Sequence, residues 1–369
     1  MSFPRVALLW CGLVLSLSAS GQILIGQTAG FTGTVGAGVT ETADGAKLYL
    51  DAVNGRGGIG GQKIELISLD DKFDPQLAAA NARKLIEDNQ VLALFLTRGT
   101  PHTQAIVPLL NQHGVALIAP STGAMVLHQP VLRYVFNVRA TYQREAEKAV
   151  AHLSSIGISR IAVIHVDDSF GTDALAGATR GFEAANLSPV AVEKFDRVKP
   201  DFSKIVQKVV VARAQSVMVF GSGSAVVDCI AALRAGKSAA QVVTLSNNAS
   251  SGFVKSLGDN ARGVVISQVF PNERTISYLL VREAQEMAKA KGQAEISPAM
   301  LEGFAAAKVL VEALRRTGPK PTRERLVAAL DNLKKLDIGG LEISYSPTDH
   351  TGLDFADLAI IGPDGRFRR

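Results

Sequence analysis

The stretch "NGRGGIGGQKIEL", residues 54–66, places five glycines within the seven positions from Gly55 to Gly61. Glycine-rich loops that bind phosphate follow a strand and precede a helix, where free N–H groups and the helix dipole face the anion. Here the order is reversed, because a helical pattern precedes the glycines and the strand-like "KIELISL" follows them. A helix C-terminus presents carbonyl oxygens, which repel phosphate. The stretch therefore predicts a tight turn with positive φ angles and no nucleotide site.

Strand and helix patterns alternate on both sides of this turn. The helix before it, "TETADGAKLYLDAVN", has Ala43, Ala46, Leu50 and Val53 on one face. The unbroken apolar runs "QILIGQT", "VLALFL" and "VALIA" are typical of parallel strands that helices cover on both faces. The alternation starts again at "YQREAEKAVAHLSSIG" and continues to "VVISQVF". Two successive blocks predict two α/β lobes rather than one large sheet.

The composition agrees with a folded protein of more than one domain. The chain has 369 residues, of which 47% are hydrophobic and 20% charged, so about two to three domains with full-sized cores are expected. Its 39 basic and 34 acidic residues give a net charge of +5. No Lys/Arg block of the kind that follows a nucleic-acid backbone is present in the sequence. We therefore predict no nucleic-acid partner.

The first twenty residues have the pattern of a cleavable secretory signal peptide. "MSFPR" carries one positive charge, "VALLWCGLVLSL" is apolar and too short to span a bilayer, and "SAS" offers small residues for cleavage. We predict a signal peptide over residues 1–20. After its removal Cys229 would be the remaining cysteine, so the mature chain could form no internal disulfide. The apolar helical surroundings of Cys229 predict that it is a small core residue.

The sequence lacks recognisable catalytic motifs. No serine has glycines both two residues before and two residues after it, as a nucleophile elbow requires, and the six histidines are scattered without HExxH spacing. The segment from Gly236 to Ser238 resembles the end of a phosphate-binding loop, but Ala231 stands where its first glycine would be. We therefore predict a protein that is not an enzyme and holds no cofactor or metal ion.

Polar loops follow the predicted strands, and ligands of open α/β sheets bind beyond the carboxyl ends of the strands. One such loop, "TRGTPHT", predicts Thr100 as a helix N-cap with Pro101 at the first helical position. The first N–H groups of that helix would then favour a carboxylate. Ser121 and Thr122 follow the neighbouring strand and could donate hydroxyl hydrogen bonds to the same group. We predict a small carboxylate-bearing ligand.

The segments "DGAKLYLDAVNGRGGIGGQKIELISLDDKFDP" and "GTPHTQAIVPLLNQHGVALIAPSTGA" resemble the branched-chain amino-acid type (Leu/Ile/Val-binding protein-like) of periplasmic substrate-binding protein of ABC transporters. The resemblance covers essentially the whole mature chain. It implies the type I periplasmic binding protein or Venus flytrap fold, in which two Rossmann-like lobes joined by three crossings close on a ligand. The N-terminal lobe would comprise residues 21–139 plus 268–347. The C-terminal lobe would comprise residues 140–267 plus 348–369.

The resemblance also implies a function. An exported, periplasmic protein would capture an amino acid, branched-chain or otherwise hydrophobic, in the cleft between the lobes and deliver it to an inner-membrane ABC permease. We expect it to act as a monomer. Two alternatives stay open: a ligand-sensing or regulatory protein on the same fold, and a binder of aromatic or aliphatic carboxylates rather than amino acids.

Eight residues are expected to bind the ligand by this resemblance: Gly99, Thr100, Ser121, Thr122, Tyr142, Phe170, Ser222 and Asn247. The family holds the α-carboxylate with the loops that here contain Thr100 and Ser121. It holds the ammonium group with an acidic residue in the loop that here reads "TLSNNAS" and with a tyrosine in the loop that here reads "GSGSA". This sequence has Asn247 and Ser222 there, so an ammonium group would meet no carboxylate.

Overall fold

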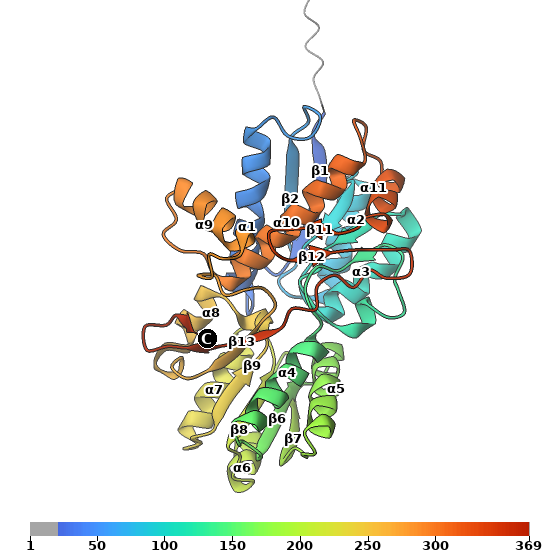
Figure 1. Ribbon diagram of the computed structural model, residues 1–369. Coiled ribbons are helices and arrows are strands. Elements are labelled where there is room, and N and C mark those ends of the chain that lie inside the picture. The colour runs from blue at the N-terminus through green and yellow to red at the C-terminus, as the bar shows by residue number, and fades with distance from the viewer. Residues whose placement is uncertain (1–20, 369) are drawn as a thin grey trace, which may run out of the picture.

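The computed structural model describes residues 21–368 and shows two α/β lobes, one above the other in Figure 1. The predicted signal peptide lies outside the described residues. The first lobe contains a sheet with strand order β2-β1-β3-β4-β5, and the second a sheet with order β14-β13-β10-β9-β8-β6-β7. The two predicted lobes, each built on a mostly parallel sheet, are therefore confirmed.

The first sheet is parallel throughout. Its strands are β1 (Ile23–Ala29), β2 (Ile64–Asp70), β3 (Ala93–Phe95), β4 (Ala116–Ile118) and β5 (Val135–Phe136). The helices of this lobe are α1 (Gly36–Gly55), α2 (Pro75–Glu87), α3 (Thr100–His113), α9 (Leu279–Ala290), α10 (Pro298–Arg316) and α11 (Arg323–Asp331), with the short helix η1 (Met125–Leu127). A separate antiparallel pair joins β11 (Leu336–Asp337) and β12 (Glu342–Ile343).

The second sheet is parallel except at one edge, where the two last strands run antiparallel. Its strands are β6 (Ile161–Val166), β7 (Ala191–Phe195), β8 (Ser216–Phe220), β9 (Gln241–Thr244), β10 (Val265–Gln268), β13 (Asp357–Ile361) and β14 (Phe367–Arg368). Its helices are α4 (Tyr142–Ser155), α5 (Ser169–Ala184), α6 (Ser203–Val211), α7 (Ser224–Ala235) and α8 (Ser251–Leu257), with the short helices η2 (Ser246–Asn248) and η3 (Gly258–Asn260).

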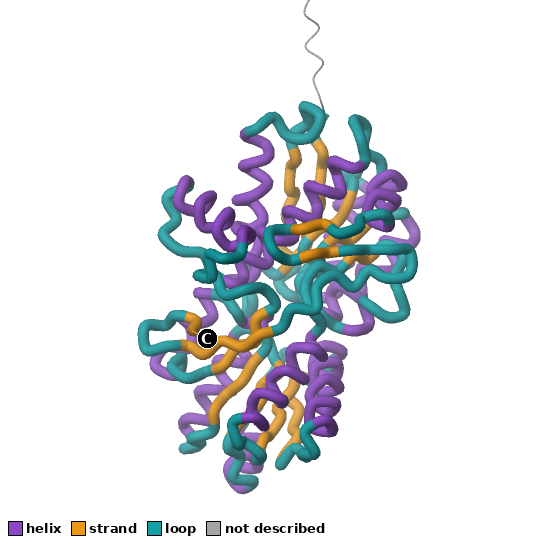
Figure 2. The backbone as a smooth tube through the Cα atoms, in the orientation of Figure 1, coloured by secondary structure: helices purple, strands orange, loops and turns teal. Residues whose placement is uncertain are grey.

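Figure 2 shows helices on both faces of each sheet and loops where the chain passes between the lobes. Within residues 21–368 these passages lie between β5 and α4, between β10 and α9, and between β12 and β13. All residues of β3, β4, β6 and β8 are buried, as expected for parallel strands covered on both faces. Cys229 is buried on α7, as predicted. In the described part of the chain, no helix is long and apolar enough to cross a membrane.

The glycine-rich stretch is the predicted turn between α1 and β2. Helix α1 ends at Gly55, and φ is positive at the four glycines that follow, which are Gly57, Gly58, Gly60 and Gly61. The side chain of Asn54 secures the turn, because its Nδ2 donates to the carbonyl of Ile64 and its Oδ1 accepts from the Ile64 N–H, both at 2.8 Å. The predicted apolar face of α1, which contains Ala43, Ala46, Leu50 and Val53, is buried.

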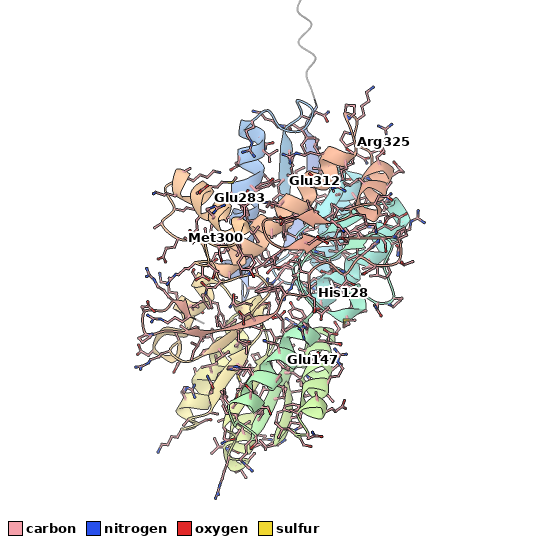
Figure 3. The ribbon with its side chains drawn as sticks, in the orientation of Figure 1. His128, Glu147, Glu283, Met300, Glu312 and Arg325 are labelled. Atoms are coloured by element: carbon pink, nitrogen blue, oxygen red, sulfur yellow. The ribbon has the colours of Figure 1, made fainter. Side chains whose placement is uncertain are left out.

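Helices α1 and α10 pack with their backbones in close contact. A Cβ atom added at Gly45 on α1 would lie 1.9 Å from the carbonyl oxygen of Met300, and one at Gly303 on α10 would lie 1.8 Å from that of Thr42. Figure 3 labels Met300, which lies in the first turn of α10. Only glycine therefore fits at these two positions without displacing a helix.

We expect Gly45→Ala to lower the free energy of unfolding by about 1–3 kcal/mol or more, because the added methyl group forces the two helices apart. Gly55→Ala is the matched control on the same helix, since no atom lies within 4 Å of a Cβ atom placed there. Alanine has a greater helix propensity than glycine, so this control should leave the free energy of unfolding unchanged or raise it by up to about 1 kcal/mol. Urea denaturation of both variants measures the difference. Equal midpoints for the two variants would contradict the close packing.

Candidate ligand-binding site

A pocket of about 490 Å³ lies between the two lobes, beyond the carboxyl ends of several strands. The first lobe contributes the loop between β1 and α1 and the side chain of Arg98, which follows β3. The second lobe contributes the N-termini of α7 and α8 together with residues of η2. The lining residues are Gly33, Thr34, Val35, Ala37, Gly38, Arg98, Gly223, Ser224, Val227, Asn247, Asn248, Ser250, Gly252, Phe253 and Ser256.

Arg98 is the one charged residue among those that line this pocket. Its side chain is buried, with 6% of the residue exposed. Nη1 donates to Ser121 Oγ at 2.9 Å, and Nη2 donates across the cleft to the backbone oxygen of Asn247. Burial lowers the pKa of Arg98, but a guanidinium stays protonated in proteins. The pocket therefore presents a fixed positive charge.

Asn247 is held on the opposite wall by its amide nitrogen. Nδ2 donates to the carbonyl of Gly221 and to Ser222 Oγ, both at 3.0 Å. Because a carbonyl oxygen only accepts hydrogen bonds, the contact with Gly221 determines which way the amide points. The other amide atom, Oδ1, is buried and has no hydrogen-bond partner in the structure. It is an acceptor at the pocket wall without a donor.

A buried ionic cluster lies beside the pocket, where the chain first crosses between the lobes. Arg139 Nη2 donates to the carboxylate of Glu145 and to Ser246 Oγ, and Nη1 lies 3.8 Å from Glu302 Oε1. Burial is the largest single effect and by itself would lower the pKa of Arg139, but the charges of Glu145, Tyr142 and Glu302 and the hydrogen bond to Glu145 together hold the pKa above its ordinary value. Glu145 also accepts from the N–H of Ser246 and from the hydroxyl of Ser267. The cluster thus joins α10, the crossing and the second lobe.

Ser121 connects this cluster to Arg98. Its hydroxyl accepts from Arg98 and donates to Glu302 Oε1 at 2.8 Å. Glu302 is therefore linked through Ser121 to Arg98, the charged residue of the pocket, and lies close to Arg139 of the crossing. A continuous chain of polar contacts runs from the pocket to the segment about which the lobes would move.

The lobes touch on several sides of the pocket. The N–H of Ser224 donates to the carbonyl of Thr34 at 3.2 Å, and the hydroxyl of Ser169 donates to Gln104 Oε1 at 2.6 Å. The carboxylate of Glu41 on α1 accepts from the first N–H groups of α8, at 2.9 and 2.7 Å. The structure is therefore a closed arrangement of the two lobes.

The prediction that Thr100 caps α3 is wrong by one residue. The helix begins at Thr100, and Gly99 is the N-cap without a side-chain hydrogen bond. Gly99 has φ 90°, a conformation that favours glycine, so the helix starts one residue earlier than expected. The Thr100 hydroxyl instead pairs with that of Thr122 at 2.8 Å, and both residues are buried. Pro101 is therefore the second residue of the helix rather than the first.

The remaining predicted residues fall into two groups. Tyr142 and Phe170 are both buried and pack edge to face with ring centroids 4.7 Å apart, and burial raises the pKa of Tyr142. Ser222 contacts Asn247, as described above. Of the eight residues that the sequence suggested, Asn247 lines the pocket, while Ser121 and Ser222 contact residues that line it.

Sequence reasoning missed Arg98, although the loop that contains it was singled out. The available signal was a single charged residue among the hydroxyl and glycine residues of "TRGTPHT". It also missed the cluster of Arg139, Glu145 and Glu302, whose members come from separate elements. In the described part of the chain, no group of three or more His, Cys, Asp or Glu residues could hold a metal ion.

Comparison with known proteins identifies the family. The "Amino acid binding protein" of Pseudomonas aeruginosa is 26% identical over 209 residues, 56% of this chain and 55% of that protein, so this match spans about half of the relative. The "Leu/Ile/Val-binding protein BraC3" of Rhizobium johnstonii is 22% identical over 95% of each chain. A substrate-binding periplasmic protein from Ralstonia solanacearum has a similar crystal structure, with a TM-score of 0.86, 30% identity, and coverage of 94% of this chain and 99% of that one. The sequence model of the family described as "Periplasmic binding protein" matches residues 22–360, and the chain therefore belongs to the periplasmic binding proteins.

Proposed function

We propose that this protein is exported to the periplasm, binds a small carboxylate-bearing ligand in the pocket between its lobes, and delivers it to an inner-membrane ABC permease. The observation that carries the proposal is the buried guanidinium of Arg98 in a pocket whose described lining contains no acidic side chain. A buried charge needs a counter-charge or hydrogen-bond partners. A ligand carboxylate would supply both.

The geometry of Arg98 suits a carboxylate. A guanidinium has five N–H donors in a planar fork that matches the two oxygens of a carboxylate. One donor on Nη1 and one on Nη2 are used by Ser121 and Asn247, which leaves donors for the ligand. The first turns of α1 and α7 also line the pocket, and the positive end of each helix dipole adds about 0.3–1 kcal/mol for an anion.

The rest of the pocket suits an apolar group of moderate size. Val35, Ala37, Val227 and Phe253 contribute apolar side chains to its lining. The names of the relatives, an amino acid binding protein and a Leu/Ile/Val-binding protein, support an amino acid as one candidate ligand. Aromatic and aliphatic carboxylates fit the same combination of one positive charge and an apolar wall. A sensing role on the same fold would use the same pocket.

We also propose that the two lobes close about the three crossings. One lobe comprises residues 21–139 plus 268–347, and the other comprises residues 140–267 plus 348–369. Pocket residues from both lobes support it, since a ligand that contacts both walls favours the closed arrangement.

A thermal-shift screen tests the proposal by comparing carboxylates with their own primary amides. Amino acids, aliphatic acids and aromatic acids are each measured beside the amide of the same skeleton. A ligand at a hundred times its Kd stabilises the folded state by about 2.7 kcal/mol, which raises the melting temperature. We expect stabilisation by acids only, and a smaller radius of gyration in small-angle scattering with the bound acid. Equal stabilisation by acids and amides would contradict carboxylate recognition.

A further inference from the structure

The amide oxygen of Asn247 is the feature of the pocket that carboxylate binding leaves unexplained. Asn247 is 7% exposed and lines the pocket, and its Oδ1 is buried without a hydrogen-bond partner. A buried acceptor without a donor costs free energy that the folded protein would otherwise avoid. The amide cannot turn over to relieve this, because Nδ2 would then lose its acceptor at Gly221. A donor from the ligand would satisfy Oδ1.

The charges around Asn247 decide what kind of donor this is. The backbone oxygen of Asn247 accepts from Arg98, so a positively charged donor on the same residue would lie close to a guanidinium and be repelled. An ammonium group would need a carboxylate to offset that repulsion, and the described lining residues offer none. A neutral donor avoids the repulsion.

Three carboxylates that contact elements around the pocket are already engaged. Glu41 accepts from the first N–H groups of α8. Glu145 binds Arg139 and accepts from the N–H of Ser246 and from Ser267. Glu302 accepts from Ser121. None of them lines the pocket, so each would have to give up existing partners to hold an ammonium group.

We infer, on the basis of the proposed function, that the ligand is a 2-hydroxycarboxylate rather than an amino acid. Its carboxylate lies on Arg98, and its hydroxyl donates to Asn247 Oδ1. Arg98 donates to the backbone oxygen of Asn247, so the guanidinium and the side chain that carries Oδ1 belong to residues in direct contact. The ligand we infer accordingly carries its two groups on neighbouring carbon atoms. The hydroxyl replaces the ammonium group of an amino acid without adding a charge.

Calorimetric titration with matched ligands tests the inference on the unmodified protein. Three skeletons are each measured as the 2-hydroxy acid, the 2-amino acid and the unsubstituted acid: 2-hydroxy-4-methylpentanoate, leucine and 4-methylpentanoate; 3-phenyllactate, phenylalanine and 3-phenylpropanoate; lactate, alanine and propanoate. On the skeleton that binds best, the hydroxy acid should bind about tenfold more tightly than both others. Tighter binding of the amino acid would overturn the inference and leave the proposed function intact. If none of the nine acids binds, the proposed function fails and the inference with it.

Variants of Asn247 assign the preference to its oxygen. Asn247→Leu removes the acceptor but keeps the branched shape of the side chain, and should bring the hydroxy acid and the unsubstituted acid to within about threefold of each other. Asn247→Asp adds a carboxylate and should shift the preference toward the amino acid. Asn111→Leu, the same change at an exposed position of α3 outside the pocket lining, should leave the order of the three ligands unchanged. A hydroxy-acid preference that survives in Asn247→Leu would place the donor site elsewhere.

Discussion

Replacement of Glu145 by alanine is expected to lower the free energy of unfolding by about 3–5 kcal/mol, because it leaves a buried guanidinium without its main counter-charge. Arg139 is 1% exposed and Glu145 is fully buried. The variant also removes the acceptor for the N–H of Ser246 and the hydroxyl of Ser267. Glu145→Gln, which keeps the shape but loses the charge, should fall between the parent and the alanine variant.

Glu147→Ala is the matched control for this prediction. Glu147 lies two residues further along α4 and pairs with Arg180, but its side chain is 29% exposed and that of Arg180 is 53% exposed. Figure 3 labels Glu147 on the second lobe. A surface ion pair of this kind contributes less than about 1 kcal/mol. Urea denaturation of the three variants measures the difference, and equal losses at positions 145 and 147 would show that the buried cluster does not stabilise the fold.

Replacement of Arg98 by leucine is expected to weaken binding of the carboxylate ligand by roughly 30- to 5,000-fold, which corresponds to about 2–5 kcal/mol. The variant removes the one charged side chain of the pocket lining and leaves the ligand carboxylate without its counter-charge. Arg98→Lys should give a smaller loss, because an ammonium keeps the charge but not the planar fork. Calorimetric titration with the tightest-binding acid measures these changes.

Two controls accompany the Arg98 variants. Arg366→Ala removes a guanidinium from an exposed site, where it pairs with Glu295 and its side chain is 49% exposed, and should leave the Kd unchanged. Circular dichroism and urea denaturation establish that each Arg98 variant is folded before it is titrated. If folded Arg98→Leu binds the acid as tightly as the parent, the carboxylate lies elsewhere and Arg98 serves only to join the lobes through Asn247.

Much of the fold follows from the sequence, because its signals are local. The turn at residues 54–66 depends on glycines that adopt positive φ angles and on an asparagine that bonds to the next strand ten residues later. The buried face of α1 follows from helical spacing, and the buried strands follow from unbroken apolar runs. These patterns involve residues that are close in the chain, so they can be recognised before the tertiary structure is known.

The start of α3 shows where such local reasoning ends. Thr100 followed by proline is a common pattern for a helix cap. Gly99 takes that position because its φ of 90° lets the chain turn one residue earlier, and the hydroxyl of Thr100 bonds to Thr122 instead. The partner that decides the role of Thr100 lies on another loop. No pattern near Thr100 indicates this pairing.

The sequence by itself determined the two α/β lobes, the turn chemistry and the loops in which a ligand would be sought. Only the tertiary structure brought Arg98 into contact with Asn247 and buried Arg139 against Glu145 and Glu302. The pocket joins the start of α1, the loop after β3 and the segments from α7 to α8, which are distant in the chain. Which of their side chains meet depends on how the two lobes pack together, and packing across the cleft leaves no periodic signal in the sequence of either lobe.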